Sequence, residues 1–314
     1  MPRLIAVVGA TGAQGGGLVR AILADRSGAY RARAITRRPE SDKARALARQ
    51  GAEVVAADLD HPPSVERAFA GAHAVFCVTN FWEHMSVERE IAQGTAQAHA
   101  AKAAGVEHAI WSTFEDTRRW VPLEDARMPT LAGRYKVPHF DGKSEVNQVF
   151  EALGVPTTFL LTSFYWDNFI HHGLGPKRGP DGKLALVLPM DDKKLPGIAA
   201  EDIGPAAFGM FTRGKEFIGR TVGIAGEHLT GAQMAAGLTR ALGETVTYRP
   251  VPPDVFRGFG FPGAEDLGNM FQFKRDFNDY YCASRDVDLT RRLHPGLLTF
   301  EAWLARYARQ IPLD

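Results

Sequence analysis

The sequence predicts an α/β protein with a doubly wound parallel sheet and a smaller α+β lobe in its C-terminal half. Three observations support this prediction: short β-branched runs alternate with amphipathic segments, glycines recur where helices should end, and a glycine-rich turn follows the first strand. The chain has 314 residues, of which 45% are hydrophobic and 23% charged, and this composition is typical of a globular protein.

Five short apolar runs in the first half are predicted strands: residues 4–8, 31–36, 53–56, 74–78 and 108–112. The segments between them carry apolar residues at three- and four-residue spacing and are predicted helices: residues 14–24, 43–50, 63–70 and 87–104. Four helical segments are followed by a glycine, the residue that most often ends a helix in the left-handed conformation. These glycines are Gly51, Gly71, Gly105 and Gly154.

A long polar segment, residues 114–138, interrupts this alternation and is too long for an ordinary connection, so we expect it to be functional or disordered. A helix over 139–153 and a sixth strand over 156–162 follow.

We therefore divide the chain into a dinucleotide-binding domain, residues 1–162, and a smaller C-terminal lobe for substrate or effector, residues 163–314, interleaved with the first. The elements expected in this lobe are a turn at 173–182, a hairpin strand at 184–188, short strands near Val222 and Val246, and helices at 202–212, 230–242, 264–277 and 299–310.

Charge and cysteine content exclude several classes of function. Lys and Arg total 37 against 36 Asp and Glu, so no excess of positive charge favours nucleic acid as a partner. Cys77 and Cys282 lack the spacing of a zinc site or a disulfide framework, which agrees with a cytoplasmic protein. No apolar run reaches the ~18 residues of a membrane span, and we expect no metal site.

The turn after the first strand is the strongest functional signal. It reads Gly9-Ala10-Thr11-Gly12-Ala13-Gln14-Gly15 and leads into an amphipathic helix. Gly9 permits the tight turn, Gly12 lets a pyrophosphate approach the backbone, and Gly15 allows close packing of helix on strand. A flexible turn is the alternative, but the position within a βαβ unit favours the Rossmann type of dinucleotide site.

The end of the second strand indicates which dinucleotide is bound. An NAD site places an acid there, whereas this sequence has Arg37 and Arg38, which suit the 2′-phosphate of NADP(H). Arg37 is the stronger candidate, and an exposed basic loop is the alternative. After the third strand, Asp58 and its neighbour Leu59 are assigned to the adenine; Asp58 and Asp60 could equally cap the next helix.

Beyond these signals, the chain resembles the NmrA-like family, an atypical branch of the extended short-chain dehydrogenases that includes NADPH-sensing HSCARG-type proteins. The resemblance covers nearly the whole chain. It is carried by GATGAQGG at 9–16, TRRP at 36–39, VTNFWE at 78–83, HFDGK at 139–143, FYWDN at 164–168 and FPGAEDLGNMF at 261–271. It implies that Thr79, Asn80 and Phe81 line the cofactor cleft and that Lys143 holds the nicotinamide ribose. It also implies that the nicotinamide end is bordered by Tyr165, Trp166, Asp167 and Asn168.

The chain departs from the superfamily's catalytic pattern, Tyr-x-x-x-Lys, because His139 stands where the tyrosine should be. Loss of a positioned proton donor typically costs ~10²–10⁴ in rate. His139 and Lys143 are the remaining catalytic candidates, with His139 either a substitute donor or a capping or packing residue. Ser112 and Thr113 could support such a site or simply be satisfied strand-end hydroxyls.

Two hypotheses follow for the function. The leading one is an NADP(H)-binding, redox-sensing regulator without turnover, in which cofactor occupancy orders residues 114–138 and alters binding to a protein partner. The alternative is an NADPH-dependent reductase of a quinone or enone-like small molecule. A homodimer is compatible with both, and a DNA-associated repressor is disfavoured by the charge balance.

Overall fold

The computed structural model describes residues 1–313 and divides the chain into two compact units. Unit 1 consists of Met1–Asp116, His139–Thr162 and Glu201–Val222, and unit 2 of Thr117–Pro138, Ser163–Ala200 and the chain from Gly223 onward. The units exchange segments: residues 117–138 belong to unit 2 and residues 201–222 to unit 1. A single division after residue 162 therefore does not describe the two units.

Unit 1 is built on a seven-stranded sheet in the order β11-β6-β5-β4-β1-β2-β3, and every neighbouring pair from β6 to β3 is parallel. This order confirms the predicted doubly wound α/β fold. The strands are β1 Arg3–Val7, β2 Tyr30–Thr36, β3 Glu53–Ala56, β4 Ala74–Cys77, β5 His108–Thr113, β6 Thr157–Leu161 and β11 Thr221–Gly223.

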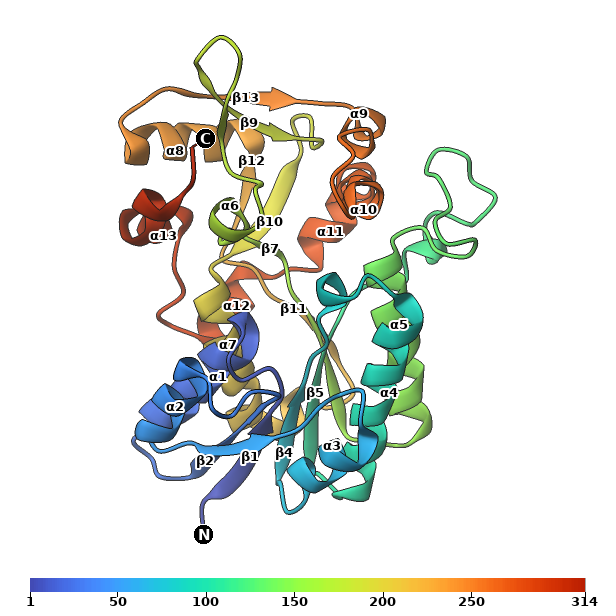
Figure 1. Ribbon diagram of the computed structural model, residues 1–314, viewed down its shortest axis with the longest axis vertical. Coiled ribbons are helices and arrows are strands. Elements are labelled where there is room, and N and C mark those ends of the chain that lie inside the picture. The colour runs from blue at the N-terminus through green and yellow to red at the C-terminus, as the bar shows by residue number, and fades with distance from the viewer. Residues whose placement is uncertain (314) are drawn as a thin grey trace. The chain divides into compact units, whose positions relative to one another are not determined.

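Helices cover both faces of this sheet (Figure 1). On one face lie α1 Ala13–Ala24, α2 Asp42–Arg49 and α7 Ala200–Arg213, and on the other α3 Pro62–Phe69, α4 Val87–Ala103 and α5 Pro138–Ala152. Helices α1 and α7 meet backbone to backbone, because a Cβ added at Gly204 would lie within 2.2 Å of the Gly17 carbonyl carbon. The predicted elements of the first 162 residues are all present, and no end differs by more than one residue from its prediction.

Glycines also bring α4 and α5 together on the opposite face. A Cβ at Gly94 would lie 2.8 Å from a methyl group of Val146, and one at Gly142 would lie 2.6 Å from a methyl group of Val87. Both positions therefore require the absence of a side chain. This close approach brings Glu90 of α4 to Lys143 of α5.

The strand near Val222 lies elsewhere than expected. We assigned it to the C-terminal lobe, but β11 is the seventh strand of the central sheet, next to β6. Its approach is fixed by backbone hydrogen bonds, with the Phe159 amide donating to Arg220 O at 2.9 Å and the Gly219 amide donating to Thr157 O at 2.7 Å. A three-residue strand carries too little periodicity to show which sheet it joins.

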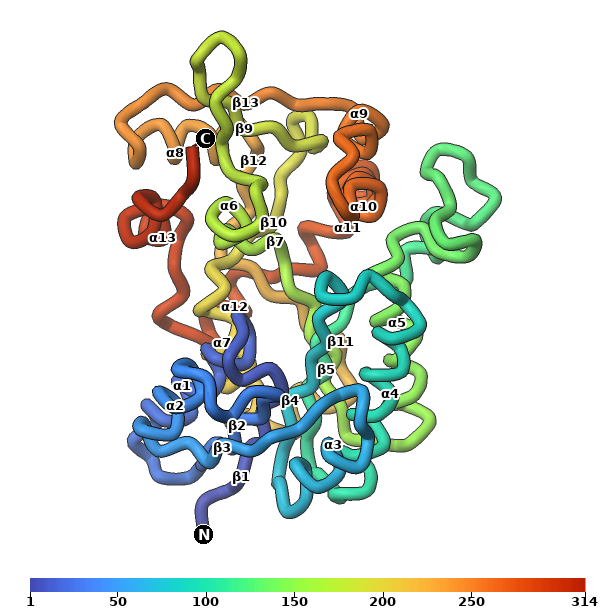
Figure 2. The backbone as a smooth tube through the Cα atoms, in the orientation of Figure 1, coloured from blue at the N-terminus to red at the C-terminus, as the bar shows by residue number. Residues whose placement is uncertain are grey.

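Unit 2 contains two three-stranded sheets, in the orders β12-β10-β7 and β13-β9-β8. Their strands are β7 Phe164–Tyr165, β8 Lys177–Arg178, β9 Leu184–Leu188, β10 Lys194–Ile198, β12 Glu227–Thr230 and β13 Val246–Pro250. The predicted hairpin is confirmed: β8 and β9 pair antiparallel, and the turn between them projects as a loop (Figure 2). Strand β10 contains Pro196 and Gly197, which hid it from pattern analysis.

The helices of unit 2 follow mainly in its C-terminal part. They are α6 Asn168–His171, α8 Gly231–Leu242, α9 Pro253–Arg257, α10 Ala264–Asp276, α11 Asn278–Ala283, α12 Val287–Leu293 and α13 Phe300–Tyr307. None of the helices within residues 1–313 combines the length and the apolar character needed to cross a membrane.

Residues 117–138 form a folded part of unit 2 rather than a disordered segment. The Asn269 side-chain amide on α10 donates to Pro129 O at 2.9 Å and to Lys136 O at 2.6 Å, and Gln272 donates to Arg127 O at 2.8 Å. The Lys136 ammonium, 1% exposed, donates to Met128 O at 2.7 Å. Side chains of α10 thus satisfy part of the backbone of the segment, and its ordering by cofactor binding stays a prediction.

The buried His108 at the start of β5 gives unit 1 a pH-dependent stability. Its Nε2 lies 2.8 Å from Thr158 Oγ1, which donates to Phe217 O, so Nε2–H is the donor to Thr158. Burial lowers the pKa of His108 from about 6.5 to about 4. Between these values the unfolded chain binds a proton that the folded chain does not, so the free energy of unfolding falls as the pH falls.

We expect this effect to reach about 3 kcal/mol between pH 6.5 and pH 4. Denaturant titration across this range measures it. The His108→Gln variant replaces the imidazole N–H by an amide N–H donor that does not titrate. Its free energy of unfolding should therefore depend less steeply on pH. Equal slopes for the two proteins would contradict the assignment.

Candidate functional site

The glycine turn forms an exposed backbone cradle between β1 and α1. Gly9 has φ +64°, a conformation that L side chains rarely adopt, and its carbonyl accepts the Gly12 amide at 2.8 Å. A Cβ at Gly15 would lie 2.6 Å from both Val8 O and Gly9 O. This position in the first turn of α1 therefore requires glycine. Within residues 1–313 no side chain caps α1 at Gly12, which leaves its positive end to an anion.

Arg37, at the end of β2, is already engaged by an acid. Its guanidinium donates to the Glu83 carboxylate through both terminal nitrogens, at 2.5 Å and 2.9 Å. This hydrogen-bonded ion pair lowers the pKa of Glu83 and raises that of Arg37. Glu83 ends the short 3₁₀ helix η1, Phe81–Glu83, and no sequence pattern indicates its pairing with Arg37. Arg38 is exposed.

The acids after β3 do not cap α3. The Asp58 carboxylate accepts the Asp60 amide at 3.0 Å within its own turn, and the residue before α3 is His61. Asp60 forms an ion pair with Arg89 of α4 and accepts from Gln93 at 2.9 Å. The capping alternative is therefore wrong, and the Asp58 side chain is held at the carboxyl end of the sheet. Leu59 packs against the core beneath this turn.

Lys143 is the centre of a buried polar network. Its ammonium lies 2.6 Å from Glu90 Oε1 and donates to Thr79 Oγ1 at 2.5 Å and Thr79 O at 3.0 Å. The Thr79 hydroxyl in turn donates to Glu90 Oε1 at 2.6 Å. The Glu90 side chain is fully buried and that of Lys143 is 8% exposed. The network therefore anchors α5 to the end of β4, the segment that the resemblance assigned to the cofactor cleft.

His84 extends this network on the other side of Glu90. Its Nδ1 accepts the Ser86 amide at 3.1 Å, so in the neutral ring Nε2 carries the proton, and Nε2 lies 3.5 Å from Glu90 Oε2. Sequence analysis missed both His84 and Glu90. Glu90 is one of several acids at the start of α4, and only the contact with α5 distinguishes it.

His139 lies at the start of α5, as predicted, and faces aromatic rings. Its ring centroid is 4.8 Å from that of Trp82 and 5.9 Å from those of Phe81 and Phe114, and the residue is 4% exposed. His139 and Lys143 therefore both contact the Thr79–Trp82 segment from α5. Asn80, at the start of η1, is exposed beside them.

The FYWDN run lies in unit 2, where its contacts are structural. Trp166 is 1% exposed and packs on Phe300 and Trp303, so it belongs to the core of unit 2 and does not form an open wall against a nicotinamide. The Asp167 carboxylate accepts the Ala200 amide at 2.8 Å. Tyr165 ends β7 and Asn168 begins α6, and both are only partly buried.

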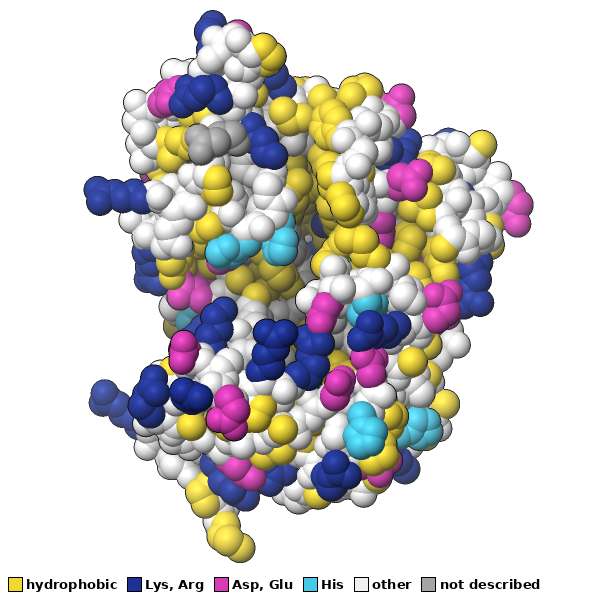
Figure 3. All heavy atoms as spheres, in the orientation of Figure 1, with side chains coloured by type: hydrophobic (Ala, Val, Ile, Leu, Met, Phe, Trp, Pro, Cys, Tyr) yellow, Lys and Arg dark blue, Asp and Glu magenta, His cyan; other side chains and the backbone are white. Residues whose placement is uncertain are grey.

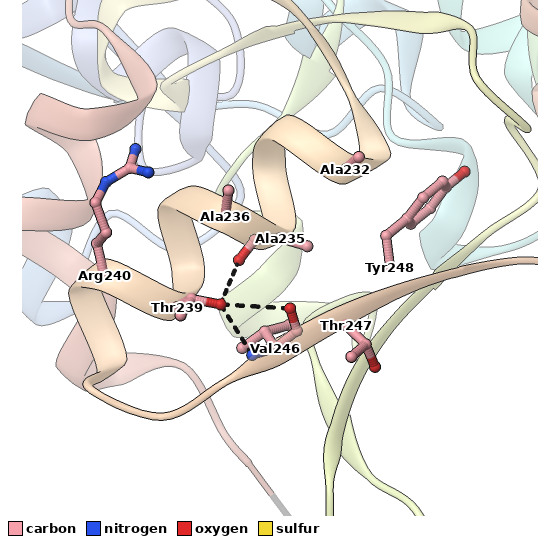
Figure 4. A pocket seen from close by; sticks show the side chains of 8 residues that line it. All are labelled: Ala232, Ala235, Ala236, Thr239, Arg240, Val246, Thr247 and Tyr248. Carbon is pink, nitrogen blue, oxygen red and sulfur yellow. Dashed lines mark hydrogen bonds between the residues drawn. The ribbon is translucent and has the colours of Figure 1, made fainter.

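A shallow depression lies between α8 and β13 (Figure 4). Its Thr239 hydroxyl donates to Ala235 O at 2.9 Å and accepts the Val246 amide at 2.9 Å, which ties the helix to the strand. The Tyr248 hydroxyl donates to Leu188 O at 3.3 Å. These polar groups are engaged in holding unit 2 together, so the depression has no set of convergent groups that would bind a ligand. Within residues 1–313 no three His, Cys, Asp or Glu side chains are grouped to hold a metal ion.

Comparisons with known proteins agree on a family. The family model described as the NmrA-like family matches residues 1–304. An NmrA-like family domain-containing protein of Dictyostelium discoideum is 28% identical, over 98% of each chain. The NmrA-like family domain-containing oxidoreductase FrzB of a Cladobotryum species is 28% identical, over 90% of this chain and 87% of its own.

Solved structures of NmrA, described as a negative transcriptional regulator, also match almost the whole chain. Its complex with NADP is 27% identical, with a TM-score of 0.78, and the match covers 98% of this chain and 96% of that one. A complex of the same protein with NAD gives the same values. None of these comparisons distinguishes the HSCARG-type members, so that finer resemblance stays a prediction. The match over almost the whole chain, together with the fold, shows that this chain belongs to the NmrA-like family.

Proposed function

We propose that this chain binds NADP(H) on unit 1. The pyrophosphate would lie on the backbone of residues 9–15, where Gly9, Gly12 and Ala13 are exposed. The 2′-phosphate would lie at Arg37 and the adenine near Asp58. The uncapped start of α1 and the left-handed Gly9 support this placement, and so do the NADP and NAD complexes of NmrA. Lys143, Thr79, Asn80 and Phe81 would adjoin the nicotinamide end.

We further propose that the bound cofactor serves as a redox signal for a protein partner rather than as a reductant for a substrate. The observation that carries this proposal is the environment of the two catalytic candidates. His139 is enclosed by aromatic rings, and Lys143 is fully committed to Glu90 and Thr79. Neither side chain is positioned to donate a proton to a substrate oxygen, so carbonyl reduction at this site would have no general acid.

The test is NADPH oxidation with a panel of quinones, enones and aldehydes, run beside calorimetric titration with NADPH. We expect tight binding of NADPH without oxidation above the protein-free background. The His139→Tyr variant, which restores Tyr-x-x-x-Lys, should acquire trace carbonyl reductase activity from an inactive parent. Turnover by the unaltered protein would overturn the sensor proposal.

The second candidate function is NADPH-dependent reduction of a quinone or enone-like molecule, and the naming of FrzB as an oxidoreductase favours it. Hydride transfer to such acceptors produces a stabilised anion that water can protonate, so a strong acid is less necessary. If the parent is active, His139→Ala separates two mechanisms: a large fall in kcat assigns the proton to His139, and an unchanged kcat assigns it to another group.

A cytoplasmic location and a homodimer remain predictions under both hypotheses.

Arg37 should carry the preference for NADP(H). Arg37→Ala removes the guanidinium that would meet the 2′-phosphate, so we expect NADPH affinity to fall by about tenfold or more while NADH affinity changes little. Calorimetric titration with both dinucleotides measures the ratio. Arg38→Ala is the matched control, and a loss confined to that variant would move the 2′-phosphate site to Arg38.

A further inference from the structure

The Arg37–Glu83 ion pair occupies the position where the proposed function requires a phosphate. The end-on face of the Arg37 guanidinium, formed by its two terminal nitrogens, now donates to the Glu83 carboxylate. Two anions cannot both take this face, so a 2′-phosphate that binds there displaces Glu83. A phosphate that takes the Nε–H edge instead lies beside the negative charge of Glu83.

The surroundings of Arg37 add to this competition. Besides Glu83, the carboxylates of Asp58 and Asp60 raise the pKa of Arg37 through their charge. Asp60 is itself paired with Arg89. Figure 3 shows acidic and basic side chains interspersed in the lower half of the face, without a uniformly basic surface. Nearby carboxylates thus partly compensate the positive charge of Arg37. A phosphate that binds there is attracted by the guanidinium and repelled by these carboxylates.

The ion pair is nevertheless weak enough to be displaced. The side chains of Arg37 and Glu83 are 50% and 42% exposed, and ion pairs at such exposure contribute little because water screens them. A phosphate dianion carries more charge than a carboxylate and can accept both guanidinium hydrogen bonds. Exchange of one anion for the other is therefore feasible at the surface.

Building on the proposed NADP(H) binding, we propose that Glu83 is a specificity-determining residue: its carboxylate is an internal competitor for the 2′-phosphate and lowers the preference for NADP(H) over NAD(H). NAD(H) lacks the phosphate and can bind with the ion pair intact. NADP(H) must displace Glu83 or bind beside its negative charge, and so loses part of the affinity that the phosphate contact supplies.

The competition also connects the two ends of the cofactor site. Glu83 is the last residue of η1, whose Trp82 contacts the His139 ring at 4.8 Å between centroids. Release of Glu83 frees the end of η1 from β2, whereas binding of NAD(H) leaves it attached. The dinucleotide with a 2′-phosphate would therefore change the environment of Trp82 in a way that NAD(H) does not.

The test compares the affinities of NADPH and NADH in Glu83→Gln. Removing the competing charge should tighten NADPH binding about twofold to fivefold and leave NADH binding unchanged. In an Arg37→Ala background the same substitution should have no effect on the ratio. Glu53→Gln is the matched control, because Glu53 is 41% exposed, pairs with Arg33 at 3.0 Å and lies at the start of β3.

The two proposals can fail separately. If the unaltered protein binds neither dinucleotide, the proposed function fails and this inference falls with it. If it binds NADPH but Glu83→Gln leaves the NADPH to NADH ratio unchanged, or shifts it no more than Glu53→Gln does, the competition is disproved and NADP(H) binding stands. As a second readout, the oxidised dinucleotides are compared, because they do not absorb tryptophan emission. NADP⁺ should change the tryptophan fluorescence of the unaltered protein more than NAD⁺ does, and Trp82→Phe should remove that excess.

Discussion

Gly12→Val is expected to abolish binding of both NADPH and NADH in a protein that still folds. Gly12 has φ −95° and ψ −173°, which a valine can adopt, and an added Cβ would lie 3.2 Å from Gly9 O, a contact that a small shift relieves. The branched side chain would then project from the exposed start of α1 into the space proposed for the pyrophosphate. We expect the affinity to fall by more than about a hundredfold, or about 2.7 kcal/mol.

Isothermal titration calorimetry measures the loss, and circular dichroism with thermal unfolding establishes that the variant is folded. Gly12→Ala should give an intermediate loss, because it adds only the Cβ. Gly15→Ala is the contrasting variant: its Cβ would clash with two backbone oxygens at 2.6 Å, so stability rather than binding alone should fall. A folded Gly12→Val with unchanged affinity would show that the loop is only a turn.

The central sheet was predictable because its signals are local. The strands of the first 162 residues are four to seven residues long and mostly apolar. Helices between them carry their own end signals, as the capping residues Ser41 of α2 and Ser86 of α4 illustrate. Strand β11 was expected near Val222 but placed in the wrong unit, because three residues carry too little pattern to show which sheet they join. Strand β10 was not predicted, because it contains a proline and a glycine.

The candidate site was predictable only in part, for a related reason. The glycine turn and Arg37 follow from position in a βαβ unit, which a single sequence reveals. The partners of these residues do not: Glu83 lies 46 residues after Arg37, and Glu90 lies 53 residues before Lys143. Acids on helices are common at the surface, so nothing in the sequence marks Glu90 as one of the few that are fully buried.

The burial of Glu90 leads to the largest stability effect that we expect, that of Lys143→Met. The substitution removes the ammonium 2.6 Å from a carboxylate with no exposed surface. Thr79 can still donate one hydrogen bond to Glu90, and His84 Nε2 lies 3.5 Å from its other oxygen, but the buried carboxylate loses the lysine cation. Breaking a buried ion pair in this way typically costs about 3–5 kcal/mol. Chemical denaturation should show this loss in the free energy of unfolding.

The double variant Lys143→Met/Glu90→Gln separates the charge from the packing. A neutral amide can keep the hydrogen bond from Thr79 without an unpaired charge, so the double variant should recover much of the stability that the single variant loses. Arg178→Met is the control, since Arg178 pairs with Glu244 at the same 2.6 Å but both side chains are more than 40% exposed. That variant should change stability by about 1 kcal/mol or less. If Lys143→Met proved no more costly than Arg178→Met, the buried network would not be what joins α5 to β4, and the committed state of Lys143 that argues against catalysis would lose its basis.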